Sequence, residues 1–225
     1  MQILKSFKCY SLVILFFMSL TQLNAQDSNL GNWFQYFGSK KINDKWNWHN
    51  EVQYRNYNAI GDLEQLLLRT GIGYNLTEGN NNILFGYGYI LSENYIGNTD
   101  EKESVNEHRL FLQFITKQKI KNTIIQHRYR FEQRWVEDDF KLRFRYFLGF
   151  NIPLKAEPIA DGDFYLSIYN EIFLNSEGNT FDRNRLYGAL GRKFNSNLKL
   201  ELGYMNQFLG ESNRDQINIG VFYNF

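Results

Sequence analysis

Two kinds of side chain alternate without a break along residues 126–135, and this alternation predicts a β-strand. One face carries charges and the other is mainly aromatic: Arg128, Arg130, Glu132 and Arg134 against His127, Tyr129, Phe131 and Trp135, with Gln133 as the one polar exception. A protein core does not accept the charged face, because an unpaired buried charge is too costly. The aromatic face does not suit water. The wall of a membrane barrel, with lipid outside and a polar lumen inside, suits both faces.

The same alternation recurs in segments of about ten residues separated by turns, which is typical of transmembrane barrels. We find it at residues 33–41, 46–57, 65–76, 83–91, 107–117, 126–135, 141–154, 164–175, 198–208 and 216–225, while 183–194 is strand-like but its two faces cannot be told apart. Bacterial single-chain barrels have even strand numbers. These eleven segments therefore predict an all-β, single antiparallel transmembrane β-barrel of about twelve strands, with an extra strand within residues 26–37, or of ten. The acidic stretch 92–106 is expected to be the longest loop.

A soluble β-sandwich would also alternate, with its charged faces in water. Two features favour the membrane barrel instead. The apolar face repeatedly carries Trp or Tyr at strand ends, as the interfacial girdles of membrane proteins do. The chain also stops on an aromatic residue, Phe225, at the end of an alternating segment.

The N-terminus predicts a cleaved secretory signal peptide over residues 1–25. Lys5 and Lys8 precede an apolar run at 10–20, and Ala25 ends the expected cleavage site. That run is too short for a spanning helix, which needs about 20 residues. The mature barrel would cover residues 26–225. Because the only cysteine, Cys9, would leave with the signal, no disulfide is expected.

Six motifs follow one another along almost the whole mature chain. They are NWFQYFGSKKINDKWNWHNEVQYR, LLLRTGIGYNL, NEHRLFLQF, HRYRFEQRW, LRFRY and YNEIFLN. Together they resemble the outer-membrane β-barrel family catalogued as domain of unknown function 2490. The resemblance implies a barrel fold and a location in the outer membrane of a Gram-negative bacterium, and it implies no activity. Phe225 resembles the signature by which the barrel-assembly machinery recognises its substrates.

An enzyme is not the expected function. A hydrolase of membrane lipid, the weakest alternative, would need a serine, a histidine and an acid close together. Of His49, His108 and His127, only His49 is expected to face the lumen, and no serine motif accompanies it. No cluster has metal-ligand spacing, so we expect no catalytic residue, metal or cofactor. The export signal argues against nucleic acid as a partner.

The remaining candidate site is a row of charged residues on the lumen face. It comprises Glu51, Arg55, Arg69, Glu107, Arg109, Arg128, Arg130, Glu132, Arg134, Arg143, Arg145, Glu171 and Glu201. Arginine-rich walls serve anion pathways, which predicts a narrow, porin-like, anion-preferring pore for small anionic solutes. The alternative is a salt-bridged interior that fills a small barrel and conducts nothing. Outer-membrane lipid is the expected surrounding, and the oligomeric state stays open.

Within this row, Glu132 is predicted to be the central acid. Counting along the hairpins places it opposite Arg143 or Arg145 on one side and near Arg109 on the other. Neighbours on one face of a sheet have Cβ atoms about 4.5–5.5 Å apart, which is close enough for ion pairs.

Overall fold

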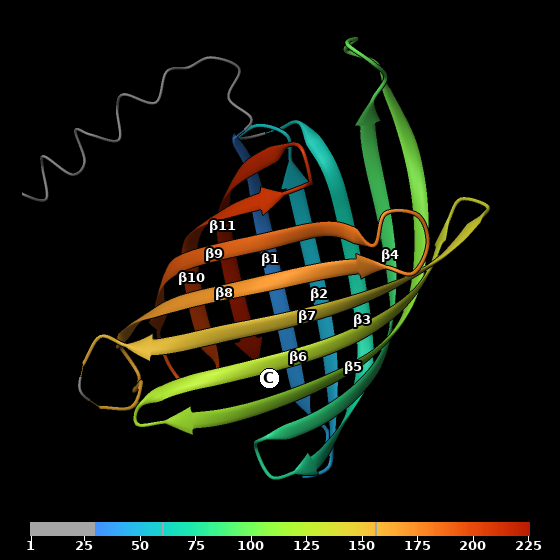
Figure 1. Cartoon of the computed structure of the whole chain (residues 1–225). Helices are drawn as coiled ribbons and strands as arrows, with labels where there is room; N and C mark the ends of the chain where they lie inside the picture. The colour runs from blue at the N-terminus through green and yellow to red at the C-terminus, as the bar shows by residue number, and fades with distance from the viewer. Residues whose placement is uncertain (1–29, 60, 156) are drawn as a thin grey trace, which may run out of the picture.

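Eleven strands form one closed barrel in the computed structural model, which describes residues 30–59, 61–155 and 157–225 (Figure 1). The predicted signal peptide at 1–25 lies outside these residues. The strands are β1 (Leu30–Lys41), β2 (Trp46–Asn56), β3 (Leu63–Thr77), β4 (Asn81–Tyr95), β5 (Lys102–Ile120), β6 (Thr123–Val136), β7 (Asp139–Pro153), β8 (Phe164–Asn175), β9 (Phe181–Lys193), β10 (Leu198–Phe208) and β11 (Asn213–Asn224). In this part of the chain no helix is long and apolar enough to cross a membrane.

The barrel closes through a parallel pair. Every consecutive pair of strands is antiparallel, whereas β1 runs parallel to β11, with Phe34 opposite Ile219. The prediction of an all-β barrel is confirmed, and the described strand number of eleven lies between the two numbers expected. An odd number puts the two ends of the barrel chain at opposite rims. We call the rim where β1 begins at Leu30 the N-terminal rim, and the rim that carries Phe225 the C-terminal rim.

The prediction that residues 92–106 form the longest loop is wrong. The alternation of β4 and β5 continues beyond the barrel, so these strands form a projecting hairpin joined by residues 96–101 (Figure 1). The longest described connection is instead 154–163, at the C-terminal rim. Asp163 anchors it by accepting hydrogen bonds from the Lys155 ammonium and the Ala160 backbone N–H, the latter at 3.0 Å. The bond from Lys155 holds the pKa of the Asp163 carboxyl below its usual range.

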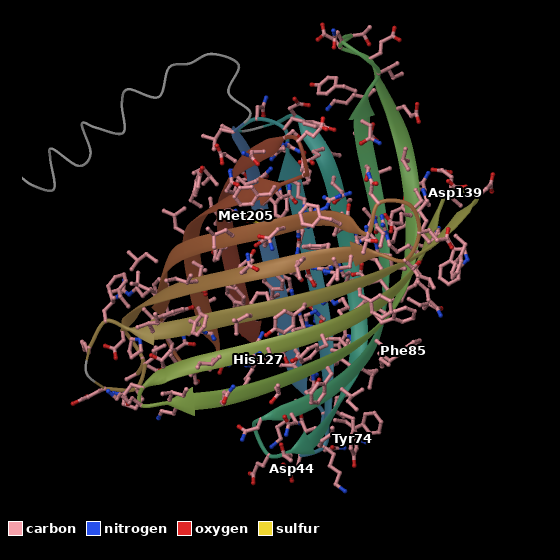
Figure 2. All side chains as sticks on the ribbon, in the orientation of Figure 1. Asp44, Tyr74, Phe85, His127, Asp139 and Met205 are labelled. Atoms are coloured by element: carbon pink, nitrogen blue, oxygen red, sulfur yellow. The ribbon has the colours of Figure 1, made fainter. Side chains whose placement is uncertain are left out.

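The outer face of the wall is apolar. Phe85 is 59% exposed and Leu202 is 62% exposed, and Figure 2 shows Phe85 and Tyr74 pointing away from the barrel. Aromatic residues gather near the C-terminal rim, where the Phe225 ring lies 6.0 Å from that of Trp48. The Phe225 N–H donates to the Ser39 carbonyl at 3.0 Å, which fastens the chain end to β1.

Inward-facing aromatic rings fill part of the lumen. Several lie directly over glycines of the neighbouring strand: a Cβ at Gly203 would come within 2.6 Å of the Tyr187 ring, and one at Gly86 within 2.3 Å of the Phe111 ring. Only a residue without a side chain permits so close an approach. The barrel interior is therefore narrowed by rings as well as by charged side chains.

Candidate functional site: the charged interior of the barrel

All thirteen residues of the predicted charged row lie on strand faces that point into the barrel. Eleven are buried, and Arg128 and Arg134 are half-buried. Period-two alternation fixes this placement, because an inward side chain on a strand is followed by an outward one. Most of the row is held by ion pairs, whereas Arg55 donates to Gln53 and Gln65, and Glu201 accepts from Tyr165 and Tyr187.

Glu132 is the most enclosed acid of the row, with 1% exposure. Its Oε2 accepts from Arg143 Nε at 2.9 Å and Nη2 at 2.6 Å, and its Oε1 accepts from Arg145 Nη1 at 2.8 Å. Arg130 Nη1 lies 3.7 Å from the same carboxylate. A planar guanidinium forms such forked pairs with a carboxylate readily. Glu132 therefore joins arginines of its own strand and of β7.

The expected neighbour on β5 is different. Glu132 lies opposite Phe111, and Arg109 lies opposite Arg134. Arg109 and Arg134 both pair with Glu107, at 2.7 Å for Arg109 Nη2 and 3.0 Å for Arg134 Nη2 to Oε2. Arg109 thus lies near Glu132, as expected, but one pair further along, and the described residues show no ion pair between the two, because the tight turn after Ile120 gives a register two residues from the expected one.

The pairs continue around the wall to β8 and β9. Arg145 Nη2 and Arg128 Nη2 both donate to Glu171 Oε1, at 2.8 Å and 2.7 Å. Arg143 Nη1 also reaches Asp182 at 3.0 Å. Glu107, Glu132 and Glu171 thus each serve two or more arginines, and the ion pairs link the five consecutive strands from β5 to β9.

The half of the interior nearer the N-terminal rim is packed with buried side chains. Each strand contributes one inward side chain that is no more than 7% exposed: Trp33, Arg55, Leu67, Ile90, Phe111, Glu132, Arg143, Phe173, Arg185, Gln207 and Gln216. We call this layer the septum. Small barrels have interiors that side chains can fill, whereas about sixteen strands leave an aqueous channel. A layer of buried side chains from all eleven strands fits the filled interior of a small barrel.

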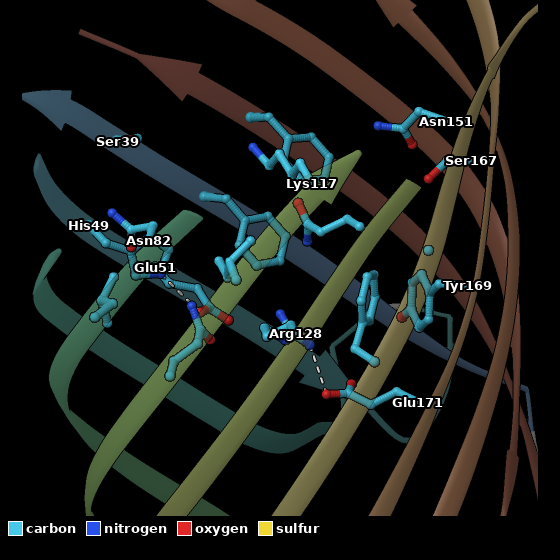
Figure 3. A pocket seen from close by; sticks show the side chains of 18 of the residues that line it. Ser39, His49, Glu51, Asn82, Lys117, Arg128, Asn151, Ser167, Tyr169 and Glu171 are labelled. Atoms are coloured by element: carbon cyan, nitrogen blue, oxygen red, sulfur yellow. Dashed lines mark hydrogen bonds and ion pairs between the residues drawn. The ribbon is translucent and has the colours of Figure 1, made fainter. Parts of the chain in front are cut away.

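The other half of the interior holds a cavity of about 680 Å³. Its wall extends from Trp33 and Arg185 in the septum to the C-terminal rim, where Lys41 and Asn80 contribute. Figure 3 shows Arg128 joined to Glu171 on this wall, with Lys117 and Tyr169 also lining the space. The volume falls within the range of about 300–1,000 Å³ that small-molecule pockets occupy.

The sequence missed several residues of this cavity. Arg185 was not assigned because the faces of 183–194 could not be separated, yet it is buried and donates to Gln207 at 2.8 Å. Trp33 lies between two guanidinium groups, with Arg55 Cζ at 3.7 Å and Arg185 Cζ at 4.8 Å from its ring. Lys117 and Lys199 lie on the inward faces of β5 and β10, and the alternation along these strands would have been enough to predict that they line the lumen.

The histidines do not form a catalytic arrangement. His49 faces the cavity and its Nε2 lies 3.4 Å from Glu51 Oε2. His108 bonds with the Tyr87 hydroxyl at 2.6 Å and His127 with the Tyr146 hydroxyl at 2.9 Å, both on the outer face. Among the described residues, no group of three or more His, Cys, Asp or Glu side chains is placed to hold a metal ion.

The family described as Protein of unknown function (DUF2490) matches residues 30–218, which include nearly the whole barrel. No curated protein matches the chain.

Proposed function

Since the chain belongs to the DUF2490 family, whose description assigns no activity, we propose a function from the geometry of the barrel itself. The protein is an integral outer-membrane barrel that conducts no ions and presents a basic cavity at one rim. The septum is the observation that carries this proposal, because every strand contributes a buried side chain to it.

The apolar outer face supports the membrane location. Large exposed apolar patches on a protein mark a surface that is covered in its working state. Here they run around the wall, at Leu68, Phe85, Leu112, Phe144 and Leu202, each more than 36% exposed. A closed barrel also satisfies its backbone hydrogen bonds internally, as hydrocarbon requires.

The septum disfavours the anion-preferring pore. Arg143 Nη2 is paired with Glu132 Oε2 at 2.6 Å, and Arg185 donates to Gln207 at 2.8 Å. The septum rings contact guanidinium groups, with Arg145 Cζ 4.3 Å from the Phe173 ring. An ion crossing this layer would have to break several such contacts at once. Of the two functions predicted from the row of charges, the geometry favours the non-conducting one.

Planar-bilayer recording of the refolded protein tests the absence of conduction. We expect no channel events in a salt gradient, and steady anion-selective conductance would overturn the proposal. Phe173→Ala removes a ring from the septum, while Phe144→Ala removes one from the outer face. The first variant should leak more than the second. Retention of the protein in carbonate-washed membranes tests the location, and release into the soluble fraction would refute it.

The proposal includes no catalysis. His49 is the only one of the described histidines that faces the cavity, and its contact is with Glu51 rather than with a serine. A phospholipid-release assay on the same refolded sample should give the background rate. Phospholipid hydrolysis that is present in the unmodified protein and disappears in His49→Gln would show that the function is hydrolytic rather than structural.

A further inference from the structure

The cavity carries far more positive than negative charge. Nine lysine and arginine side chains line it, against three carboxylates. Those carboxylates are already engaged: Glu51 lies 3.3 Å from Arg69, Glu171 binds two arginines, and Glu201 accepts from two tyrosine hydroxyls at 2.9 and 3.1 Å. The positive excess is therefore not neutralised by the wall itself.

Four of the lining cations have no carboxylate within 4.0 Å among the residues that the structure describes. They are Arg55, Arg185, Lys117 and Lys199. The two arginines are at the floor, and both guanidinium groups lie over the Trp33 ring, with Cζ 3.7 Å from its centroid for Arg55 and 4.8 Å for Arg185. Like charges crowded together in a partly enclosed space repel, and a bound anion would relieve that repulsion.

The two lysines lie nearer the mouth. Lys117 comes from β5 and Lys199 from β10, on different sides of the barrel, and both side chains line the cavity. Lys199 has an aromatic neighbour, with its Nζ 5.9 Å from the Phe222 ring. The cations therefore occupy two levels, at the floor and near the mouth, rather than one patch.

Between these levels the wall is aromatic. The Tyr169 ring lies 4.8 Å from Phe147 and 4.5 Å from Tyr187, and on another side Phe37 stacks on Phe222 at 4.9 Å. These rings pack against one another, so the wall between the two levels is an aromatic, apolar band against which the ring of a ligand can pack. A ligand that matches this cavity therefore has negative groups at two levels and an aromatic ring between them.

We infer that the cavity binds a small organic polyanion with a flat ring system, such as an aromatic compound bearing several phosphate, sulfonate or carboxylate groups. Its ring packs on the Phe147–Tyr169–Tyr187 wall. One anionic group reaches Arg55 and Arg185, and another lies between Lys117 and Lys199. The ligand enters and leaves by the C-terminal rim, since the septum closes the other side.

Fluorescence titration with pyranine, a pyrene trisulfonate, tests this inference on the refolded barrel in uncharged detergent. We expect saturable binding that weakens as salt is added. The double variant Lys117→Gln/Lys199→Gln breaks no ion pair with a described carboxylate, so it should fold and should weaken binding by tenfold or more. Uncharged hydroxypyrene should not bind at the same concentrations.

The matched control is Lys40→Gln/Lys45→Gln, which removes the same charge from the same rim but outside the cavity. It should leave the pyranine affinity within twofold of the unmodified barrel. No saturable binding, or equal loss in the two double variants, would overturn the inference. The measurement needs neither a bilayer nor ion flow, so its failure is distinguishable from a failure of the proposed membrane function.

Discussion

Glu132→Gln is the most direct perturbation of the ion-paired interior. It keeps the shape of the side chain but removes a charge that faces Arg130, Arg143 and Arg145. The glutamine oxygen can keep accepting from one arginine, whereas its NH₂ group is turned toward the N–H groups of another. At least one charge-assisted hydrogen bond is then lost, worth about 1.5–3 kcal/mol.

The lost charge adds to that cost. Breaking a buried ion pair at one partner costs about 3–5 kcal/mol. Two arginines retain other acids, with Arg143 on Asp182 at 3.0 Å and Arg145 on Glu171 at 2.8 Å. The lower end of the range therefore applies, and we expect Glu132→Gln to reduce the unfolding free energy by about 3 kcal/mol.

Equilibrium urea unfolding from lipid vesicles measures this loss. With a slope of about 2–3 kcal/mol per M, the midpoint should fall by about 1–1.5 M. Glu103→Gln is the control, since Glu103 is exposed on the projecting part of β5, and its effect should stay within about 0.5 kcal/mol. Equal midpoints for the two variants would refute the central role of Glu132.

Two further pairs of variants test the faces of the wall. Leu148→Arg, on the outer face of β7, should lower the unfolding free energy by about 2–4 kcal/mol near the bilayer midplane. Asn151→Arg, in the cavity wall, should lower it much less. Equal unfolding free energies would contradict the assignment of the inner and outer faces. Gly203→Ala should cost about 1–3 kcal/mol, because its Cβ would come within 2.6 Å of a tyrosine ring. Gly188→Ala, whose Cβ would meet nothing within 4 Å, should unfold as the unmodified protein does, and a similar loss in both would argue against ring packing in the lumen.

Alternation alone was enough to predict the barrel and the inward placement of the charged row. It failed at 183–194 because arginines lie on both faces of β9. Arg185 points into the septum, whereas Arg192 lies on the outer face near the rim, with its Cζ 5.2 Å from the Phe164 ring. A cation that stacks on rim aromatics looks, in sequence, like a lumen residue.

Aromatic residues were a second reason why the inner and outer faces of the strands could not all be assigned from the sequence. Phe111, Phe173 and Tyr165 are buried inside the barrel, although aromatic residues also cover the outer face. The inward rings of Phe111 and Tyr165 depend on glycines across the strand pair, Gly86 and Gly191. Such a match depends on register, and one hairpin turn can change the register by two residues, as it did between Glu132 and Arg109.

The strand number depends on how the first and last strands meet. An even number follows only if all neighbouring strands are antiparallel, and the parallel β1–β11 pair removes that condition. In this register Phe34 and Ile219 are partners on the outer face, at the separation of about 4.8 Å that paired strands keep. Cysteines at both positions should then form a disulfide under mild oxidation, because the Cα distance falls within about 4.4–6.8 Å. Cysteines at Phe34 and Val221, two residues further along, should not. Cys9 is the one cysteine of the sequence, so protein expressed from residue 26 carries no cysteine besides the two introduced ones. A mobility change on non-reducing gels in the second pair alone would show that another register, and another strand count, closes the barrel.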